Sequence, residues 1–479
     1  MDQYMYVCFW SMFVCQKALP CPKKSRRTCL AFGRGSCADN PMKINRLPRD
    51  DKTNGWSAIL PARTPHAALQ DEVTADWLVL GGGYAGLAAA RRLAENCPDQ
   101  KIVLIEAGQA GENASGRNSG FGIDLPHNVG SSLDELDGSH RFMRLARMAL
   151  DHLQEVVRTH DIKCDWRRAG KYHTAVSPRG TRNVLQPFSK ELEALGEPYE
   201  WVEGGALREK LGSDHFTAAV YTPGCVLMNP AALTRGLADS LPENVTYYEN
   251  SPVTEANFKN GAHLKTAHGS VRAQRMIMAA NGFSEQFGFH PRRFLHLVAH
   301  ASLSRPLTKA ERATYGVARP WGLTPVNAFA GITMRYADDH RILIRQGLNY
   351  RPSQRVNVAE QAVVKRQHKC LFDQRFPMLP EVEMEHTWSG FVCLSRNGAP
   401  AFGQIAPNIW SAVCQNAVGV TKGTFSGILA ADMATGLDNP LIADMQSLGQ
   451  PDLLPPRPFL DMGVRVRFQW ELWANRHEA

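Results

Sequence analysis

The chain lacks four features that would place it in a special structural class. It has no run of about 18 apolar residues, so it contains no ordinary membrane-spanning helix. It has no CxxC pair, no internal repeat and no low-complexity tract. Five of its eleven cysteines fall within the first 37 residues and the other six are scattered, which predicts a reduced, cytoplasmic protein with isolated thiols and no metal site.

A concentrated charge of one sign is also missing. The formal net charge is +8, and residues 1–41 contribute half of it through six basic and two acidic side chains. The remainder is spread over more than 400 residues, which is too diffuse for nucleic-acid binding but compatible with an anionic substrate. We therefore expect no nucleic-acid partner.

The length of 479 residues predicts two domains, and the apolar fraction of 44% is typical of a globular enzyme. Residues 1–41 differ from the rest, because the apolar run Tyr4–Val14 precedes the basic residues, which reverses the order of a secretory signal. We expect a disordered extension before a natural start at Met42, in preference to a membrane-surface anchor. Proline and Asn-Gly punctuate residues 42–72 and predict an irregular N-terminal arm.

Residues 76–106 have the pattern of a dinucleotide-binding βαβ unit. An apolar run leads into Gly81, Gly83 and Gly86, an Ala-rich helical pattern follows, and a second apolar run over 101–105 ends at Glu106. Gly81 permits the turn, Gly83 lets the backbone approach a pyrophosphate, and Gly86 lets the helix lie close to the sheet. The helix N-terminus offers N–H groups to phosphates, and the acid is placed to accept hydrogen bonds from ribose hydroxyls.

Three later segments carry small residues beside predicted strands. Residues 112–122 predict neither strand nor stable helix; we favour a cradle for an extended cofactor over a surface loop, because they follow the ribose acid. The strand 276–279 runs into Ala280-Asn281-Gly282 at its carboxyl end, the edge that faces ligands in doubly wound sheets. A second strand–glycine–helix element spans 409–435, with its helix expected from Phe425.

The remaining pattern alternates between helices and strands. Helices are predicted over 133–159, 183–195, 231–241 and 358–372, and strands over 164–176, 295–307 and 331–346. A two-residue turn at 338–339 would put Arg335 opposite Ile342, so that Arg335 and Arg345 face opposite sides of the sheet. The tail over 453–473 fits a strand or a helix, and its packing onto the body is favoured over peripheral contact with a membrane.

Taken together and in order, these segments resemble one family. The residues that carry the resemblance are Gly81–Gly86 with Glu106, Ala114–Gly120, Ala279–Gly282, and Trp388-x-Gly390 followed by Ser395–Pro400. From about residue 43 to 475 the chain resembles the FAD-dependent D-amino-acid oxidase superfamily, most closely its γ-glutamylputrescine oxidase type of bacterial amine oxidase.

The resemblance implies an α/β fold, with a Rossmann-like FAD-binding domain and a discontinuous antiparallel-sheet substrate domain. We expect residues 73–163, 225–294 and 386–445 in the first domain, 164–224 and 295–385 in the second, and 446–479 as a C-terminal tail. The cofactor-binding residues expected from the motifs and the resemblance are Gly81, Gly83, Tyr84, Ala85, Gly86, Glu106, Ala107, Ser115, Gly116, Arg117, Asn118, Ser119, Val253, Ala280, Asn281, Gly282, Gly419, Val420, Thr421, Lys422, Gly423 and Thr424.

The chain departs from the family pattern at two places near the expected meeting point of flavin and substrate. Ala417–Gly423 replaces a Phe-Ser-Gly-His-Gly-like sequence, and Arg345-Gln346 replaces a Gly-Gly step. The resemblance therefore does not specify the substrate. Cys393 lies about three residues from the position at which some relatives attach FAD, so we expect non-covalent FAD.

The implied chemistry is oxidation of the C–N bond of an amine or amino acid. A hydride passes from the α-carbon to flavin N5, the imine hydrolyses, and oxygen reoxidises the flavin to give hydrogen peroxide. Positive charge near flavin N1/O2 is expected from the helix that follows Gly423 and from Lys422. The further candidates for the substrate pocket are Arg335 and Arg345 as carboxylate clamps, with Tyr172 and His300.

Two other functional classes stay open. Besides the favoured oxidase, the second hypothesis is a flavin dehydrogenase that passes electrons to a quinone or an electron-transfer partner. The third hypothesis is an FAD-binding protein without amine turnover. An NAD-dependent dehydrogenase explains neither Ser115–Gly120 nor Gly419–Thr424 and is the weakest alternative.

Overall fold

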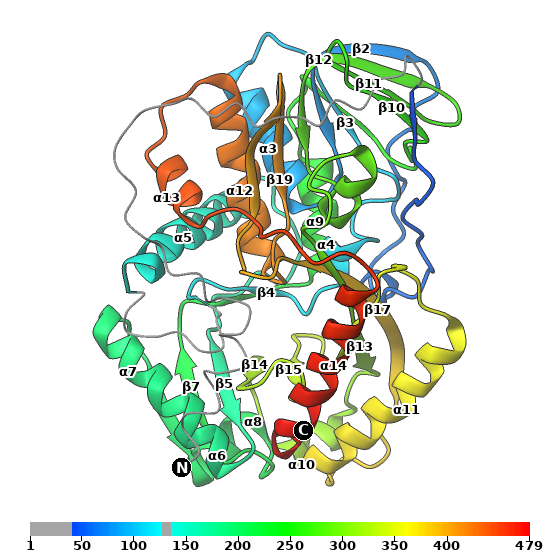
Figure 1. Ribbon diagram of the computed structural model, residues 1–479. Coiled ribbons are helices and arrows are strands. Elements are labelled where there is room, and N and C mark those ends of the chain that lie inside the picture. Colours follow the sequence, from blue (N-terminus) through cyan, green and yellow to red (C-terminus); the bar gives the residue numbers. More distant parts are fainter. Residues whose placement is uncertain (1–40, 127–135) are drawn as a thin grey trace, which may run out of the picture. The chain divides into compact units, whose positions relative to one another are not determined.

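The computed structural model describes residues 41–126 and 136–479. The extension expected over 1–41 lies outside the described residues except for Pro41, and so does the start of the helix expected over 133–159. In the described part of the chain two large sheets are present, with the first in the upper half of Figure 1 and the second in the lower half.

The βαβ unit predicted at the glycine-rich stretch is confirmed. Strand β2 (Glu72–Leu80) leads into helix α3 (Tyr84–Asn96), which returns to the parallel strand β3 (Ile102–Ile105). The last four residues of β2 and all of β3 are buried, as expected for apolar strands that are covered on both faces.

The first sheet has nine strands within the described residues. Five of them, in the order β9-β3-β2-β12-β19, run parallel, so their carboxyl ends share one edge. Strand β12 pairs with β11 along its first half and with β19 along its second half, while β18 is antiparallel to β19. The bounds are β1 (Met42–Lys43), β9 (Val245–Tyr248), β10 (Glu255–Asn257), β11 (Ala262–Lys265), β12 (Ser270–Met278), β18 (Ala401–Ala406) and β19 (Ile409–Val413).

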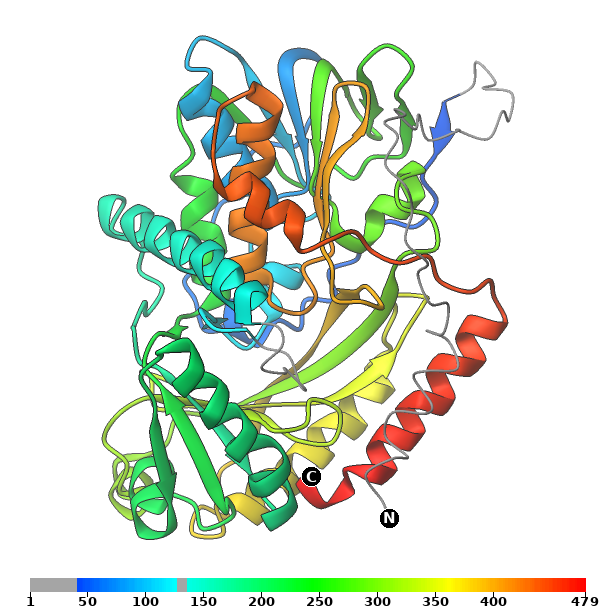
Figure 2. The same ribbon diagram turned by 60° about the vertical axis from the view of Figure 1, so that its left-hand side comes forward.

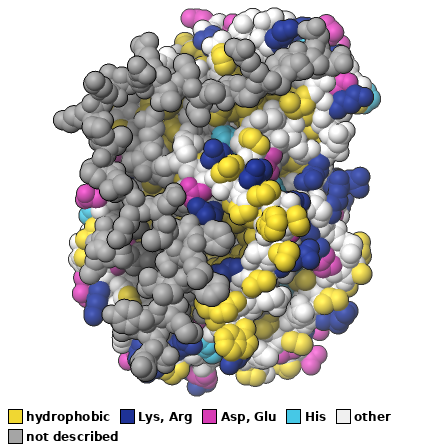
Figure 3. Space-filling model, viewed as in Figure 1, with side chains coloured by type: hydrophobic (Ala, Val, Ile, Leu, Met, Phe, Trp, Pro, Cys, Tyr) yellow, Lys and Arg dark blue, Asp and Glu magenta, His cyan; other side chains and the backbone are white. Residues whose placement is uncertain are grey.

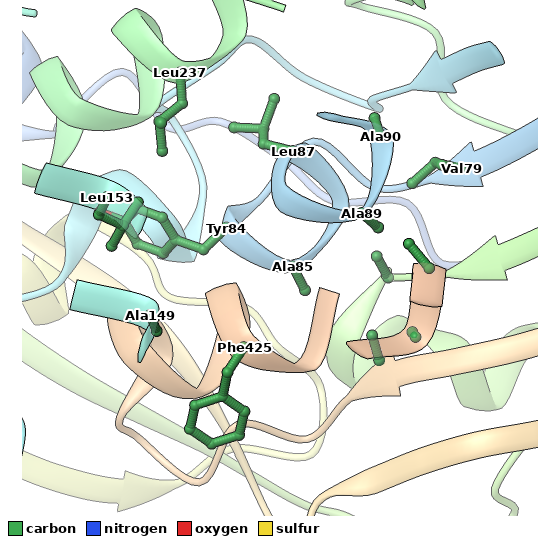
Figure 4. Close-up of a cluster of buried hydrophobic side chains, with 14 of the residues drawn as sticks. Val79, Tyr84, Ala85, Leu87, Ala89, Ala90, Ala149, Leu153, Leu237 and Phe425 are labelled. Carbon is green, nitrogen blue, oxygen red and sulfur yellow. The ribbon is translucent and has the colours of Figure 1, made fainter. Parts of the chain in front are cut away.

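Helices α3 and α12 (Gly419–Thr435) pack directly against each other beside this sheet. A Cβ on Gly427 would overlap the carbonyl oxygen of Ala85, so the two helices approach at van der Waals distance only because position 427 is glycine. Helices α5 (Leu136–Thr159), α9 (Pro230–Asp239) and α13 (Leu441–Ser447) complete the layer. In Figure 4, Phe425 of α12 and Leu153 of α5 lie within the same apolar cluster as the alanines of α3.

The second sheet has eight strands in the described residues, in the order β17-β13-β16-β15-β14-β5-β7-β6. All neighbours are antiparallel except β14 and β5, which are parallel. Their bounds are β5 (Lys171–Ala175), β6 (Glu200–Glu203), β7 (Ala218–Thr222), β13 (Leu295–Ser304), β14 (Trp321–Pro325), β15 (Thr333–Tyr336), β16 (Ile342–Tyr350) and β17 (Met384–Leu394).

Helices pack on both faces of the second sheet. Phe372 of α11 (Val358–Arg375) packs with Leu323 on the face that lies away from the first sheet. Leu192 packs with Val220 on the other face. The helices of this part of the chain are α6 (Pro178–Gly180), η2 (Thr181–Leu185), α7 (Gln186–Leu195), α8 (Gly204–Leu211), α10 (Lys309–Tyr315) and α11 (Val358–Arg375). Figure 2 shows that α11 and the C-terminal helix α14 (Phe459–Ala474) both lie along this second sheet.

Several local predictions differ from the structure. Residues 386–394 belong to β17 and pair with β13, so they lie in the second sheet and not in the dinucleotide-binding part. Residues 112–122 form a one-turn helix, α4 (Ala114–Arg117), and the strand β4 (Phe121–Gly122), which pairs with β8 (Val226–Leu227). The side chain of Asn118 stabilises that turn, because its Nδ2 donates to the carbonyl of Ser115 at 2.6 Å.

The predicted register of the β15–β16 hairpin is wrong by one residue. Residues 337–341 form the turn, closed by a hydrogen bond from the Ala337 N–H to the Arg341 carbonyl, and Arg335 opposes Leu343. Because side chains alternate along a strand, this shift places Arg335 and Arg345 on the same face of the sheet. The tail is a helix, and among the described residues no helix is both long and apolar enough to cross a membrane.

Candidate functional site

A cleft lies at the carboxyl edge of the parallel strands, where doubly wound sheets bind their ligands. The ends of strands β2, β3 and β12 form its floor through Leu80, Ile105 and Ala279. The first turn of α3, the segment after β3, and the first turn of α12 form its walls. In the part of the chain that the structure describes, no group of His, Cys, Asp or Glu side chains is arranged to hold a metal ion.

The turn from β2 into α3 depends on two glycines. Gly81 has a φ of +110°, and a Cβ there would lie 2.7 Å from the carbonyl oxygen of Ala279. A Cβ on Gly86 would overlap the carbonyl oxygen of Gly81, so Gly86 allows the turn to fold against the helix. Gly86 itself does not line the cleft.

Glu106 is held at the end of β3 by three donors. Its carboxylate accepts hydrogen bonds from the Gly82 N–H at 2.7 Å, the Gly108 N–H at 2.9 Å and Asn113 Nδ2 at 2.9 Å. Burial raises the pKa of Glu106, and the three hydrogen bonds act in the opposite direction. A carboxylate has about four acceptor positions, so Glu106 retains capacity for a ligand hydroxyl on the cleft side.

The N-termini of α3 and α12 meet at the cleft. A Cβ on Gly423 would lie 3.0 Å from the Cβ of Tyr84, so the first turns of the two helices are in contact. Helix α12 begins at Gly419, six residues before the predicted start, and the Lys422 N–H already donates to the Val418 carbonyl at 3.0 Å. The N–H groups without an intrahelical acceptor are therefore those of residues 419–421, not those of 422 and 423.

The loop between β19 and α12 is held in an unusual backbone conformation. Cys414, Asn416 and Ala417 have φ values of +63°, +50° and +65°. Asn416 Oδ1 accepts the Ser395 N–H at 2.8 Å, and the Cys414 N–H donates to Asn281 Oδ1 at 3.0 Å. These bonds fix a strained segment at the mouth of the cleft, a placement that is common at functional sites.

The structure places the expected cofactor residues in two groups. Those that line the cleft are Gly81, Gly83, Tyr84, Ala85, Glu106, Ala107, Ser115, Asn118, Val253, Ala280, Asn281, Gly282, Gly419 and Gly423. Those that lie behind its walls are Gly86, Gly116, Arg117, Ser119, Val420, Thr421, Lys422 and Thr424.

Arg117 points away from the cleft, contrary to the prediction. Its guanidinium forms ion pairs with Asp50 at 2.9 Å and Asp51 at 2.7 Å, and it donates to the Ser389 carbonyl at 3.1 Å. Arg117 therefore joins the N-terminal arm, α4 and β17. It supports the wall of the cleft from behind and is not one of the residues that line it.

The two arginines of the hairpin occupy different environments on one face of the second sheet. Arg335 is buried, donates to the carbonyls of Gly120 and Met228, and lies 5.2 Å from the Trp56 ring. Burial lowers the pKa of Arg335 to about 10. The two carbonyls hold the guanidinium against the segments at residues 120 and 228, and its Nε has no partner among the described residues.

Arg345 is half-buried and, in the described part of the chain, has no hydrogen-bond acceptor or anionic partner. It opposes Ala301, which packs with Trp56 and Trp388. The Trp56 and Trp388 indole N–H groups donate to the carbonyls of residues 118 and 117, both at 2.9 Å. Arg345 therefore lies on the face of the sheet that is turned toward the segment lining the cleft.

Tyr172 and His300 lie on the opposite, helix-covered face. The Tyr172 ring lies 5.0 Å from the Tyr221 ring at an interplanar angle of 44°, and burial raises the pKa of Tyr172 to about 12. His300 Nδ1 lies 2.9 Å from Ser389 Oγ, its Nε2 lies 3.9 Å from Glu360 of α11, and burial lowers its pKa to about 4. His300 points away from the face that carries Arg345, but it is close enough for the charges of Arg351 and Arg345 to add to the lowering of its pKa.

Lys422 is turned from the cleft toward α5. Its Nζ lies 5.4 Å from the centre of the Phe142 ring, and burial lowers its pKa to about 8. Lys422 sits in the first turn of α12 and is not one of the residues that line the cleft.

Sequence reasoning missed two parts of the cleft wall. Residues 44 and 46–49 of the N-terminal arm line it, although they were expected only to form an irregular arm. Phe391, Val392 and Cys393 at the end of β17 line it as well. The Trp388-x-Gly390 pattern could have indicated the role of β17, whereas the N-terminal arm carries no local motif.

The comparisons with known proteins agree with this geometry. Residues 76–433 match the family model described as FAD dependent oxidoreductase (DAO). A probable oxidoreductase OrdL from Haemophilus influenzae is 24% identical over 415 residues, covering 84% of this chain and 92% of the relative. A gamma-glutamylputrescine oxidoreductase from Escherichia coli is 28% identical over 396 residues, covering 80% of this chain and 88% of the relative.

Among solved structures, glycine oxidase from Geobacillus kaustophilus superposes with a TM-score of 0.64 at 19% identity. The match covers 77% of this chain and 96% of that one, and it shows that the two proteins share a fold. The matched family model spans both the βαβ unit and α12, the two elements that build the cleft. The chain belongs to the DAO family of FAD-dependent oxidoreductases.

Proposed function

We propose that this protein oxidises the C–N bond of an amine that also carries a carboxylate, with FAD as its non-covalently bound cofactor. Arg345 is the observation that carries the choice of substrate class. A half-buried guanidinium without an anionic partner in the described residues is unfavourable unless a ligand supplies the anion. A carboxylate matches its geometry, because guanidinium binds carboxylate through two parallel hydrogen bonds.

The residues of the cleft fit a dinucleotide. A Cβ on Gly83 would lie 2.7 Å from Ser115 Oγ, so this position keeps open a narrow space at the start of α3. Glu106 would hold the ribose hydroxyls, and the first N–H groups of α3 would hold the pyrophosphate.

The state of the nearby thiol supports the proposal of non-covalent attachment. Cys393 lines the cleft, and burial and the neighbouring Cys414 raise its pKa well above the usual range for a thiol. A thiol that stays protonated is a poor nucleophile. Denaturation should therefore release the flavin into solution.

Bound FAD supplies the acceptor for the hydride that leaves the α-carbon of the substrate. The chain's own residues orient the reactants. Arg345 holds the carboxylate, and the N-terminus of α12 directs partial positive charge at the cleft. Lys422 adds a positive charge about one helical turn after the start of α12.

Steady-state kinetics with matched substrates tests the proposal. We expect turnover of amino acids or N-substituted amino acids, and much weaker turnover of the same amines without the carboxylate. Production of hydrogen peroxide equal to the oxygen consumed would support the oxidase, whereas turnover with a quinone but not with oxygen would identify a dehydrogenase. Equal turnover of both members of each pair would refute the role of Arg345.

A further inference from the structure

Helix α14 presents an apolar stripe to solvent. Phe459, Met462, Val466, Trp470 and Trp473 follow the i, i+3, i+7, i+11, i+14 spacing that places side chains on one face of a helix. Their exposed fractions are 69%, 64%, 71%, 41% and 64%. Figure 3 shows hydrophobic side chains, interspersed with Lys or Arg side chains, over the area where Figure 1 draws α14.

The other face of α14 is the one that packs onto the body. Asp461 Oδ1 accepts a hydrogen bond from the Tyr350 hydroxyl at 2.7 Å, and the Phe468 ring lies 5.0 Å from that of Phe329. Glu471 is buried and pairs with Arg467. The helix is therefore docked through a face that contains both of its acids, and its more uniformly apolar face remains outside.

Basic side chains border the exposed stripe. Arg467 lies over the Trp470 ring at 4.6 Å and Arg476 lies over the Trp473 ring at 5.0 Å. Arg465 precedes them, whereas Arg457 pairs with Asp461 at 3.6 Å on the docked face; the segment 457–476 carries four arginines and two acids in all. Tryptophan and arginine beside an apolar stripe is the composition of helices that lie in the interface of a bilayer.

We propose that α14 docks this protein on the surface of an anionic lipid bilayer, with the helix axis parallel to the membrane plane. The helix of 16 residues is about 24 Å long, so the stripe is long enough to enter the headgroup region along its length. A second copy of the chain fits less well, because a two-fold interface would bring the arginine border against itself. An anionic surface matches the apolar stripe and its border together.

A matched pair of substitutions tests the proposal on the full-length holoenzyme. Val466→Glu places a carboxylate in the centre of the stripe, and Val358→Glu makes the same change at the first residue of α11, where the valine is 81% exposed. Each protein is sedimented with vesicles of phosphatidylcholine alone and with vesicles that also contain phosphatidylglycerol. Flavin absorbance of the unbound protein confirms that both variants are folded.

The wild type and Val358→Glu should co-sediment with the anionic vesicles, less with neutral ones, and less at high salt. Val466→Glu should weaken partitioning about tenfold or more, because an apolar contact is lost and like charges meet. Equal co-sedimentation of all three proteins would overturn the proposal. A dimer that Val466→Glu dissociates, without vesicle binding, would instead assign the stripe to a second copy.

Discussion

Replacing Arg345 by Gln should have opposite effects on activity and on stability. The substitution removes the charge and keeps much of the side-chain length, so it tests the guanidinium and not the space that it fills. In this protein a loss of substrate affinity should accompany a gain in the stability of the apoprotein. Replacing a residue that served only the fold would instead lower the stability of the protein.

The size of each effect follows from the contacts. A hydrogen bond to a charged group contributes about 1.5–3 kcal/mol, so kcat/KM for a carboxylate substrate should fall about 10–150-fold. Arg345 has no anionic partner among the described residues and is half-buried, so removing its charge should raise the free energy of unfolding by about 1 kcal/mol. The same variant should oxidise a carboxylate-free amine no more slowly than the wild type.

Arg335→Gln is the matched control, because Arg335 lies on the same face of the sheet with its charge engaged by protein groups. Arg335 donates to two buried carbonyls. Leaving them without a donor should lower the free energy of unfolding by about 1–3 kcal/mol. Urea denaturation of the apoproteins and steady-state kinetics measure both quantities. An Arg345→Gln protein that is destabilised like Arg335→Gln and retains full kcat/KM would refute the assignment.

Three further predictions concern the cofactor cleft and its helices. Glu106→Ala should weaken FAD binding about 10–100-fold, measured by flavin titration of the apoprotein. Gly427→Ala should lower the free energy of unfolding by about 3 kcal/mol through overlap with α3, whereas Gly463→Ala, in open space on α14, should raise it by about 1 kcal/mol. Burial lowers the pKa of Lys422 to about 8 in the folded protein, against an ordinary value of about 10.4, so the unfolded state binds more protons between these pH values. The free energy of unfolding should therefore rise with pH in this range. The rise should be smaller in Lys422→Met.

The dinucleotide-binding part could be predicted from sequence because its signals are local. The glycines at 81, 83 and 86 determine a turn within a few residues, and the spacing to Glu106 is that of one helix and one strand. The start of α12 could not be predicted in the same way. Gly419 and Gly423 are poor helix formers, and Gly423 packs against Tyr84 on a helix that is distant in the sequence.

The substrate-facing sheet was harder to predict because its geometry depends on turn length. Two acidic residues at 338 and 339 suggested a short turn, but the hydrogen bond between residues 337 and 341 closes a longer one. One residue of difference moved Arg335 to the face that carries Arg345. The ion pairs of Arg117 with Asp50 and Asp51 join segments more than 60 positions apart, and no local pattern reports them.

The visible absorption spectrum of the purified protein, recorded before and after anaerobic addition of amino acids, tests the central claim most directly. We predict flavin bands that an amino acid bleaches, that its carboxylate-free analogue bleaches much more slowly, and that return on admission of air. Acid precipitation should then leave the flavin in the supernatant. A protein that binds no flavin under any condition, or flavin bands that no carboxylate-bearing amine bleaches, would contradict the assignment.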